Sequence, residues 1–216
     1  MAKLQSIGKC SLCGESISKA AMTRHLSKCG QTRTPAIPGT PGPAPSFHLV
    51  VEGGWKAYWL HLSAPAKAPL SKLDAFLRHI WLECCGHMSA FEIGGIRYSR
   101  SPMEEERGMG TPLGRVLDVG TKFGYEYDFG STTELRLTVV GFWNLDKPKG
   151  AVQLLARNEP PPIICSQCKS QPAAEICTAC EEAWLCESCV AEHDCGEEMF
   201  LPVVNSPRTG VCGYTG

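Results

Sequence analysis

The cysteines of this chain limit its folding more than any other feature, because they fall in closely spaced pairs near the two ends. The chain has 216 residues and 13 cysteines, and eleven of these lie in residues 10–29 or after residue 164. Two-residue gaps within a pair are typical of metal ligands, and the first residues contain no apolar run resembling a secretory signal. A disulfide framework is therefore disfavoured. We expect metal ions to organise both ends.

The N-terminal cysteines belong to a C2HC pattern, CSLCGESISKAAMTRHLSKC. Zinc takes four tetrahedral ligands, and a two-residue gap lets both thiolates of a pair reach one ion. A helix from about Ser18 would put His25 and Cys29 on one face, because they are four residues apart. Ile17 and Met22 supply the small apolar core. The pattern resembles C2HC-type zinc fingers and predicts four ligands: Cys10, Cys13, His25 and Cys29.

The C-terminal cysteines form three C-x2-C pairs followed by a His-x-Cys pair, which is enough for two tetrahedral zinc sites. Seventeen residues separate Cys168 from Cys186, a zinc-ribbon spacing that favours interleaved sites over sequential ones. The order of ligands resembles B-box-type and other cross-brace modules. Sequential sites stay open as an alternative, and Cys212 can replace Cys195 because nine candidates compete for eight positions. One ion is expected on Cys165, Cys168, Cys186 and Cys189, and the other on Cys177, Cys180, His193 and Cys195.

The sequence therefore predicts about three Zn²⁺ ions per chain, and their simplest role is structural, because neither end is long enough for a core of its own. A catalytic zinc would keep an open coordination position. Cys84, Cys85 and His87 form the one other cluster with a nucleophile, at the end of a predicted helix whose dipole disfavours a thiolate. We expect Cys84 and Cys85 to be buried packing residues and, with Cys212, not to be needed by metal. No catalytic residue is predicted.

Two proline-rich segments divide the chain. The first, TRTPAIPGTPGPAPS, favours an extended spacer, and the second, from Glu159 to Pro162, is a polyproline step. The expected parts are a C2HC finger (1–31), a Pro/Gly-rich linker (32–46), an α+β domain (47–158) and a cysteine-rich zinc module (159–216).

The central part alternates apolar and polar residues. A glycine turn at residues 53–54 predicts a hairpin over 48–62, and short strands are expected over 90–93 and 96–98. A helix is expected from Ser71 to Gly86. A later hairpin has one aromatic face, made by Phe123, Tyr125, Tyr127 and Phe129. The predicted fold class is α+β, a small antiparallel sheet with a packed helix between the two zinc-binding ends.

Several motifs of the central part carry a family resemblance: YWLHL, AFEIGG, TPLGRVLDVG and above all FGYEYDFGSTTELRLTV. With these motifs the run from about Phe47 to Phe142 resembles the plasmid pRiA ORF-three-like family, also called the insertion-element passenger TnpR family. Members carry aspartate and tryptophan and then histidine after DFG, whereas this chain has Ser131, Thr132 and Thr133 there. The resemblance implies a fold and an association with mobile elements, but no defined chemistry.

Charge is distributed unevenly along the chain, although the formal net charge is only −1. Before Ser46 there are six basic residues and one acidic residue, and after Pro162 there are two basic and eight acidic residues. Phosphate attracts the first segment and repels the second. The candidate nucleic-acid contacts on the finger are Lys19, Arg24 and Lys28.

These features predict a zinc-binding, non-catalytic accessory or regulatory protein that associates with DNA or RNA through its finger and is linked to mobile elements. One alternative is a protein-interaction adaptor acting through the acidic zinc module. Another is an enzyme using the central domain, for which the sequence gives no positive support. No stretch approaches the roughly 18 apolar residues of a membrane span, so we expect a cytoplasmic protein without membrane partners.

Overall fold

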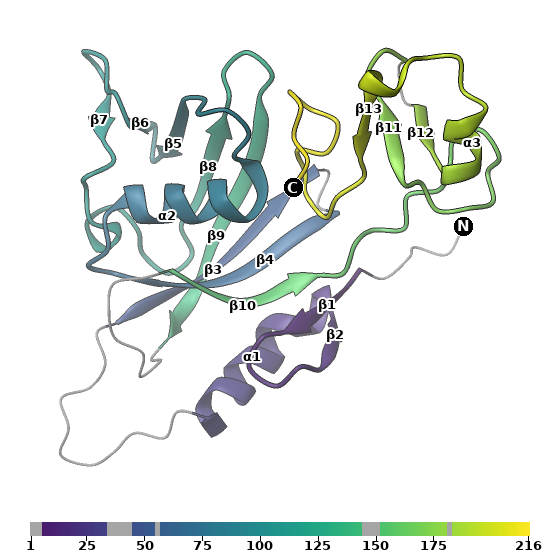
Figure 1. The fold of residues 1–216 in the computed structure, drawn as a ribbon. Helices are drawn as coiled ribbons and strands as arrows, with labels where there is room; N and C mark the ends of the chain where they lie inside the picture. The colour runs from purple at the N-terminus through teal and green to yellow at the C-terminus, as the bar shows by residue number, and fades with distance from the viewer. Residues whose placement is uncertain (1–5, 34–44, 55–56, 144–151, 181–182) are drawn as a thin grey trace.

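The large sheet of this protein has ten strands. The computed structural model describes residues 6–33, 45–54, 57–143, 152–180 and 183–216. Within them the chain forms one mixed ten-stranded sheet and one antiparallel three-stranded sheet, with fewer helical residues than strand residues (Figure 1). The expected small central sheet is therefore wrong in its size. Residues 34–44, most of the expected linker, lie outside the described residues.

Every neighbouring pair in the large sheet is antiparallel except β6 and β7. The strand order is β2-β1-β10-β4-β3-β9-β8-β5-β6-β7. The strands are β1 (Ile7–Cys10), β2 (Ser16–Ser18), β3 (Ser46–Gly53), β4 (Tyr58–Pro65), β5 (Ser89–Ile93), β6 (Ile96–Ser99), β7 (Arg107–Gly108), β8 (Lys122–Tyr127), β9 (Thr133–Trp143) and β10 (Gln153–Asn158). The expected hairpins are present, but β1 also pairs with β10, with Gly8 opposite Asn158. The finger strands thus continue the central sheet.

One face of this sheet is covered by a helix, as the sequence predicts (Figure 1). Helix α2 (Leu70–Leu77) continues as a π-helical turn, η2 (Arg78–Leu82), and a short 3-10 turn, η3 (Leu113–Arg115), follows later. Leu73, Leu77 and Trp81 are fully buried in the core between this helical segment and the sheet. Apolar burial on this scale stabilises the central part without metal.

The aromatic face of β8 ends at Tyr127, which corrects the expectation for Phe129. The side chain of Phe129 is 48% exposed, and the Arg97 guanidinium lies 4.6 Å from its ring centroid. Asp128 breaks the alternation, because its φ of 65° ends the extended backbone. Its carboxylate accepts hydrogen bonds from the backbone N–H groups of Gly130 and Ser131 in the following turn.

On the second face of the sheet, the finger covers the part formed by β4 and β10. Helix α1 (Lys19–Arg33) packs Met22 and Leu26 against the fully buried Trp59 of β4. Successive side chains of a strand point to opposite faces, so Leu60 of β4 lies in the α2 core while Trp59 lies under the finger. This explains why nearly all of β4 is buried.

The C-terminal module has its own sheet, with the order β12-β11-β13. Its elements are β11 (Glu175–Cys177), β12 (Ala183–Leu185), α3 (Glu187–Ala191), a 3-10 turn η4 (Glu197–Met199) and β13 (Phe200–Pro202). Its buried cluster consists of Cys165, Leu185, Cys186 and Cys189. Three of these four side chains are cysteines, so the module has too little apolar surface to fold on packing alone.

Beyond β13 the chain returns to the central domain, and we call residues 203–216 the C-terminal strap. Ser206 Oγ donates a hydrogen bond to the Trp81 carbonyl oxygen at 2.6 Å. The fully buried Arg208 donates to Asp128 Oδ2 at 2.7 Å, and Tyr214 is also buried. The strap is therefore held against the central domain by polar contacts and by packing.

Candidate metal centres

Four groups of cysteine and histidine side chains converge in the described residues. In each group one cysteine Sγ or histidine nitrogen per residue lies within 4.8 Å of the corresponding atoms of all the others. Zn–S bonds of about 2.3 Å in a tetrahedron place sulfur atoms about 3.8 Å apart. Thiolate and imidazole ligands also suit zinc better than the cations that prefer oxygen. Every group therefore has the composition and dimensions of a tetrahedral zinc site.

The first group is the predicted finger set of Cys10, Cys13, His25 and Cys29. Cys10 ends β1 and is fully buried, whereas His25 and Cys29 lie one turn apart on α1. The sulfur of Cys13 lies 3.3 Å from His25 Nε2. A tight turn supports the pair, because the Gly14 N–H donates to the Cys10 carbonyl oxygen at 2.8 Å.

The second and third groups lie in the C-terminal module and are interleaved. One contains Cys165, Cys168, Cys186 and Cys189, and the other contains Cys177, Cys180, His193 and Cys195. The Cys168 and Cys186 sulfurs are 3.8 Å apart, close to the tetrahedral value. Cys180 Sγ lies 3.6 Å from Cys195 Sγ and 3.6 Å from His193 Nε2. Of the two candidates for the last position, Cys195 lies with this group and Cys212 does not.

Hydrogen bonds favour the thiolate form of Cys168, one of these candidate ligands. The Ser170 hydroxyl donates to Cys168 Sγ at 3.3 Å and lowers the pKa of this thiol to about 6, together with backbone N–H groups. The thiolate, which is the form that binds metal, is therefore favoured at neutral pH.

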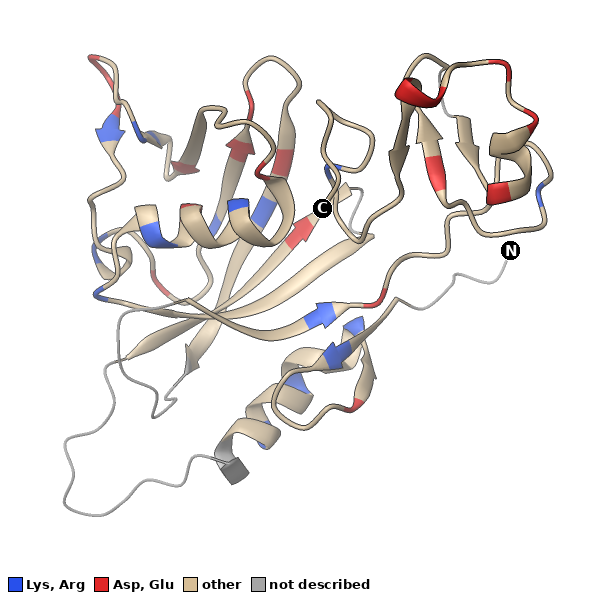
Figure 2. Ribbon diagram, viewed as in Figure 1, with Lys and Arg blue, Asp and Glu red and all other residues tan. Residues whose placement is uncertain are grey.

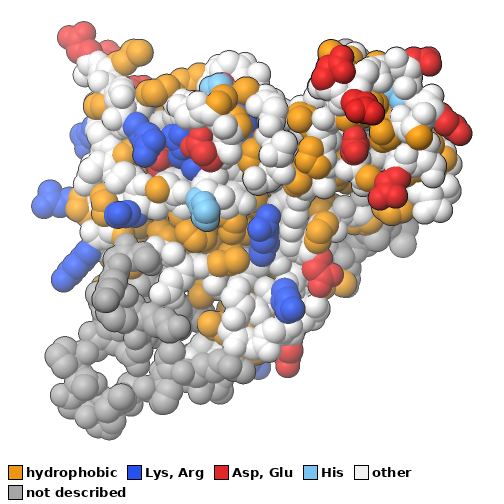
Figure 3. All heavy atoms as spheres, in the orientation of Figure 1, with side chains coloured by type: hydrophobic (Ala, Val, Ile, Leu, Met, Phe, Trp, Pro, Cys, Tyr) orange, Lys and Arg blue, Asp and Glu red, His pale blue; other side chains and the backbone are white. Residues whose placement is uncertain are grey.

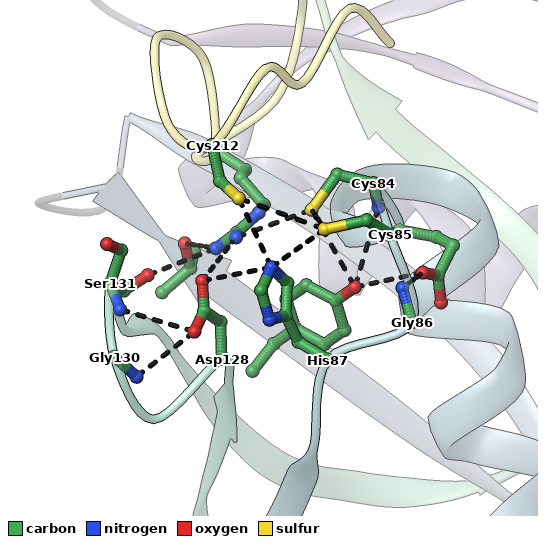
Figure 4. Close-up of polar contacts among 12 residues, drawn as sticks. Cys84, Cys85, Gly86, His87, Asp128, Gly130, Ser131 and Cys212 are labelled. Carbon is green, nitrogen blue, oxygen red and sulfur yellow. Dashed lines mark hydrogen bonds and ion pairs between the residues drawn. The ribbon is translucent and has the colours of Figure 1, made fainter.

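The sequence analysis missed the fourth group. Cys84, Cys85 and His87 lie beside Cys212 of the strap (Figure 4). The expectation of buried packing is wrong for Cys85, which is exposed, whereas Cys84 is half-buried and packs against the central core. The one signal in the C-terminal set was Cys212, the candidate that was left over when eight of nine were assigned to two sites. Its partners lie more than a hundred residues earlier, so local spacing could not identify them.

The candidate nucleic-acid residues have different surroundings. Lys19 is half-buried and forms an ion pair with Glu52 of β3, Nζ to Oε1, at 2.7 Å. Arg24 and Lys28 are exposed. They belong to α1, on which Figure 2 marks basic residues in blue. Lys19 therefore joins the finger to the central sheet, and the other two present positive charge to solvent.

A cavity of about 550 Å³ opens beside β3 and β9. Its charged lining residues are Glu52, Glu134 and Arg136, and Glu52 is engaged by Lys19. An enzymatic role for the central domain stays a prediction.

Among the described residues, none of the helices has the length and apolar character needed to cross a membrane. No family model matches the chain, and neither does any curated protein. A solved structure of a protein of unknown function, MM3350 from Methanosarcina mazei Go1, is similar at 13% identity, with a TM-score of 0.44. The match covers 52% of this chain and 67% of that chain. A likeness of this size establishes neither a family nor a function, and the pRiA ORF-three-like resemblance stays a prediction.

Proposed function

We propose that this chain is a zinc-binding, non-catalytic accessory protein that contacts DNA or RNA through its finger. Zinc would occupy the finger site and both module sites, giving three structural ions. Each of these sites offers four protein ligands, and four ligands around a tetrahedral zinc leave no position for a catalytic water. A link to mobile elements depends on the resemblance of the central domain and is part of the same proposal.

The observation that supports nucleic-acid contact is the position of Arg24 and Lys28. The two side chains are exposed and four residues apart, so they lie on one face of α1. Met22 and Leu26 point instead toward Trp59 and fix the helix on the sheet. Two cations held by a rigid support suit a sugar–phosphate backbone, and this type of binding is independent of sequence.

The test is binding of mixed-sequence duplex DNA, single-stranded DNA and RNA at a series of salt concentrations. We expect Arg24→Ala with Lys28→Ala to weaken binding and to reduce the slope of log affinity against log salt by about 2. Zinc content should not change, because neither residue is a ligand. Point substitutions are preferable to removing the finger, since its loss would uncover Trp59.

The matched control removes the same charge elsewhere. Lys67 and Lys72 are exposed on the central domain, so Lys67→Ala with Lys72→Ala changes net charge equally. The control should retain the wild-type slope. The proposal fails if the wild-type protein binds no nucleic acid at low salt, or if both double variants lose affinity equally.

A second candidate is a protein-interaction adaptor, favoured by the acidic surface of the module. Acidic side chains gather there on the face that Figure 3 shows. The exposed acidic residues are Glu187, Glu192, Asp194, Glu197 and Glu198, while Glu181 and Glu182 lie outside the described residues. A partner with a basic surface would complement this charge.

Titration calorimetry with a lysine-rich peptide tests the adaptor. We expect Glu187→Gln with Glu192→Gln to weaken binding, and Glu104→Gln with Glu105→Gln, an exposed acidic pair of the central domain, to leave it unchanged. If both double variants bind the peptide equally weakly, the peptide is attracted to the overall charge of the protein and not to the module. That result would contradict the adaptor proposal.

A further inference from the structure

We infer that Cys84, Cys85, His87 and Cys212 bind a fourth Zn²⁺ ion, which joins the C-terminal strap to the central domain. Three of these ligands follow η2 in the central domain, and the fourth comes from the strap. The site therefore differs from the other three, because it is completed by two segments far apart in the sequence.

Two sulfur–sulfur distances within this group match those of a tetrahedral zinc site. Cys85 Sγ lies 3.7 Å from Cys84 Sγ and 3.8 Å from Cys212 Sγ, close to the tetrahedral separation of about 3.8 Å. His87 Nε2 lies 3.0 Å from Cys85 Sγ and 3.2 Å from Cys212 Sγ (Figure 4). Four potential ligand atoms thus face one point.

A disulfide is the main competing explanation, and it accounts for less of this arrangement. A disulfide joins two sulfurs at about 2.05 Å, whereas three thiols here lie at metal-site separations. It would also leave the imidazole of His87 facing sulfur atoms without a role. A metal ion uses all four side chains.

The surroundings of the group resemble the hydrogen-bonded shell that orients metal ligands. Arg208 Nη2 lies 3.5 Å from Cys84 Sγ and donates to Asp128 Oδ2 at 2.7 Å. Its positive charge offsets part of the excess negative charge that three thiolates bring to a divalent ion. The carboxylate of Asp128 also lies 3.4 Å from His87 Nε2, but Arg208 and two backbone N–H groups already occupy it. Asp128 therefore supports the site and is not counted as a ligand.

The strap places Cys212 without help from the ion. Buried Arg208 and Tyr214 lie on either side of this cysteine in the sequence. Cys212 itself has a φ of 52°, an uncommon conformation for a residue other than glycine. The ligand is thus positioned before metal binds, which lowers the entropy cost of closing so distant a site.

The fourth site should exchange its ion more readily than the others. Cys85 and Cys212 are both exposed, whereas the finger set and the second module set contain no exposed ligand and the first module set contains only Cys168. Because the strap has its own contacts, loss of this ion should not unfold the protein.

Zinc content per chain, measured by elemental analysis on full-length protein purified without chelator, tests the inference. We expect four ions in the wild type and three in each of Cys85→Ser and Cys212→Ser. The double variant should also retain three, because both cysteines hold the same ion. A competing chelator should remove one ion per chain rapidly from the wild type, and this phase should be absent from the variants.

Thr215→Ser is the control, since Thr215 is exposed on the strap three residues beyond the cysteine, and it should keep four ions. The inference is overturned if Cys212→Ser binds as many ions as the wild type, or if the double variant loses two ions rather than one. A Cys85–Cys212 disulfide in freshly purified, unreduced protein, detected by peptide mapping, would also overturn it.

Discussion

The central sheet and the C-terminal module differ in the side chains that fill their interiors. The sheet buries a continuous apolar core that includes Leu73, Trp81 and Tyr125, and none of these side chains needs a metal. The buried cluster of the module is mostly cysteine sulfur. With zinc bound as we propose, the chain would combine a part stabilised by the hydrophobic effect with a part stabilised by coordination bonds.

The finger lies between these two cases. It has a candidate metal site of its own, but Met22 and Leu26 share a buried cluster with Trp59 and Leu155 of the central sheet. Backbone pairing of β1 with β10 adds to this contact. We therefore expect the finger to depend on zinc for its local fold and on the sheet for part of its stability.

The largest expected effect follows from removing one ligand of the module. Structural zinc contributes apparent free energies of about 10–16 kcal/mol in small finger peptides, so Cys186→Ser should unfold the module while the central sheet persists. Two-dimensional NMR should show loss of dispersed signals from the module, residues 165–202, only. Ser188→Ala, an exposed change on the same helix, should keep every signal dispersed. Loss of the central signals as well would contradict the comparison.

A smaller effect should follow from weakening the support of the finger. Trp59 is fully buried, and its indole Nε1 donates to Ser6 Oγ at 2.7 Å. Trp59→Ala should lower the free energy of unfolding by about 3–5 kcal/mol and increase hydrogen exchange in α1. Denaturant titration and hydrogen exchange measure the two effects. If exchange in α1 stays at its wild-type rate, the finger is independent of the sheet.

The third effect is the smallest when it is expressed per pH unit, and it concerns a buried histidine pair on the Trp59 face of the sheet. His48 Nε2 and His61 Nδ1 lie 2.9 Å apart, and burial lowers the pKa of His48 to about 4. Burial, His48 and Lys19 lower the pKa of His61 to about 3. The unfolded chain, with a histidine pKa of about 6.5, binds more protons below that pH than the folded chain does. Stability is therefore highest above pH 6.5 and falls as the pH decreases toward 4.

Between pH 6.5 and pH 4, each histidine should lower the free energy of unfolding by about 1.4 kcal/mol for each unit by which the pH decreases. The measurement is the pH dependence of unfolding free energy in the wild type and in His61→Gln. The free energy of unfolding of the variant should decrease by about 1.4 kcal/mol less per pH unit than that of the wild type. Effects of acid on the metal sites are common to both proteins and cancel in this difference. Equal slopes would mean that His61 is protonated in the folded protein.

Local pattern predicted much of this structure. The hairpins, the α2 segment and the convergence of three Cys/His groups follow from period-two alternation, helical spacing and C-x2-C gaps, all of which act within about thirty residues. The failure at Phe129 was also local: a left-handed Asp128 interrupts a strand whose alternation of residue types continues. Alternation reports side-chain chemistry and does not report backbone φ.

What could not be predicted depends on contacts between distant segments. Pairing of β1 with β10 enlarges the sheet, and the return of the strap brings Cys212 to Cys85. Neither contact produces a periodic pattern in the sequence, because each joins segments more than a hundred residues apart. The buried character of Trp59 and His61 has the same origin, since the finger covers a face that alternation alone would leave to solvent.

The measurement that tests the comparison most directly is hydrogen exchange by mass spectrometry, with and without a strong zinc chelator. We expect chelation to increase exchange strongly in residues 165–195, less strongly in 10–29, where Trp59 still supports α1, and little in 122–139. A uniform increase across all three segments would show that the metal sites and the central sheet form one cooperative unit, and would contradict the account.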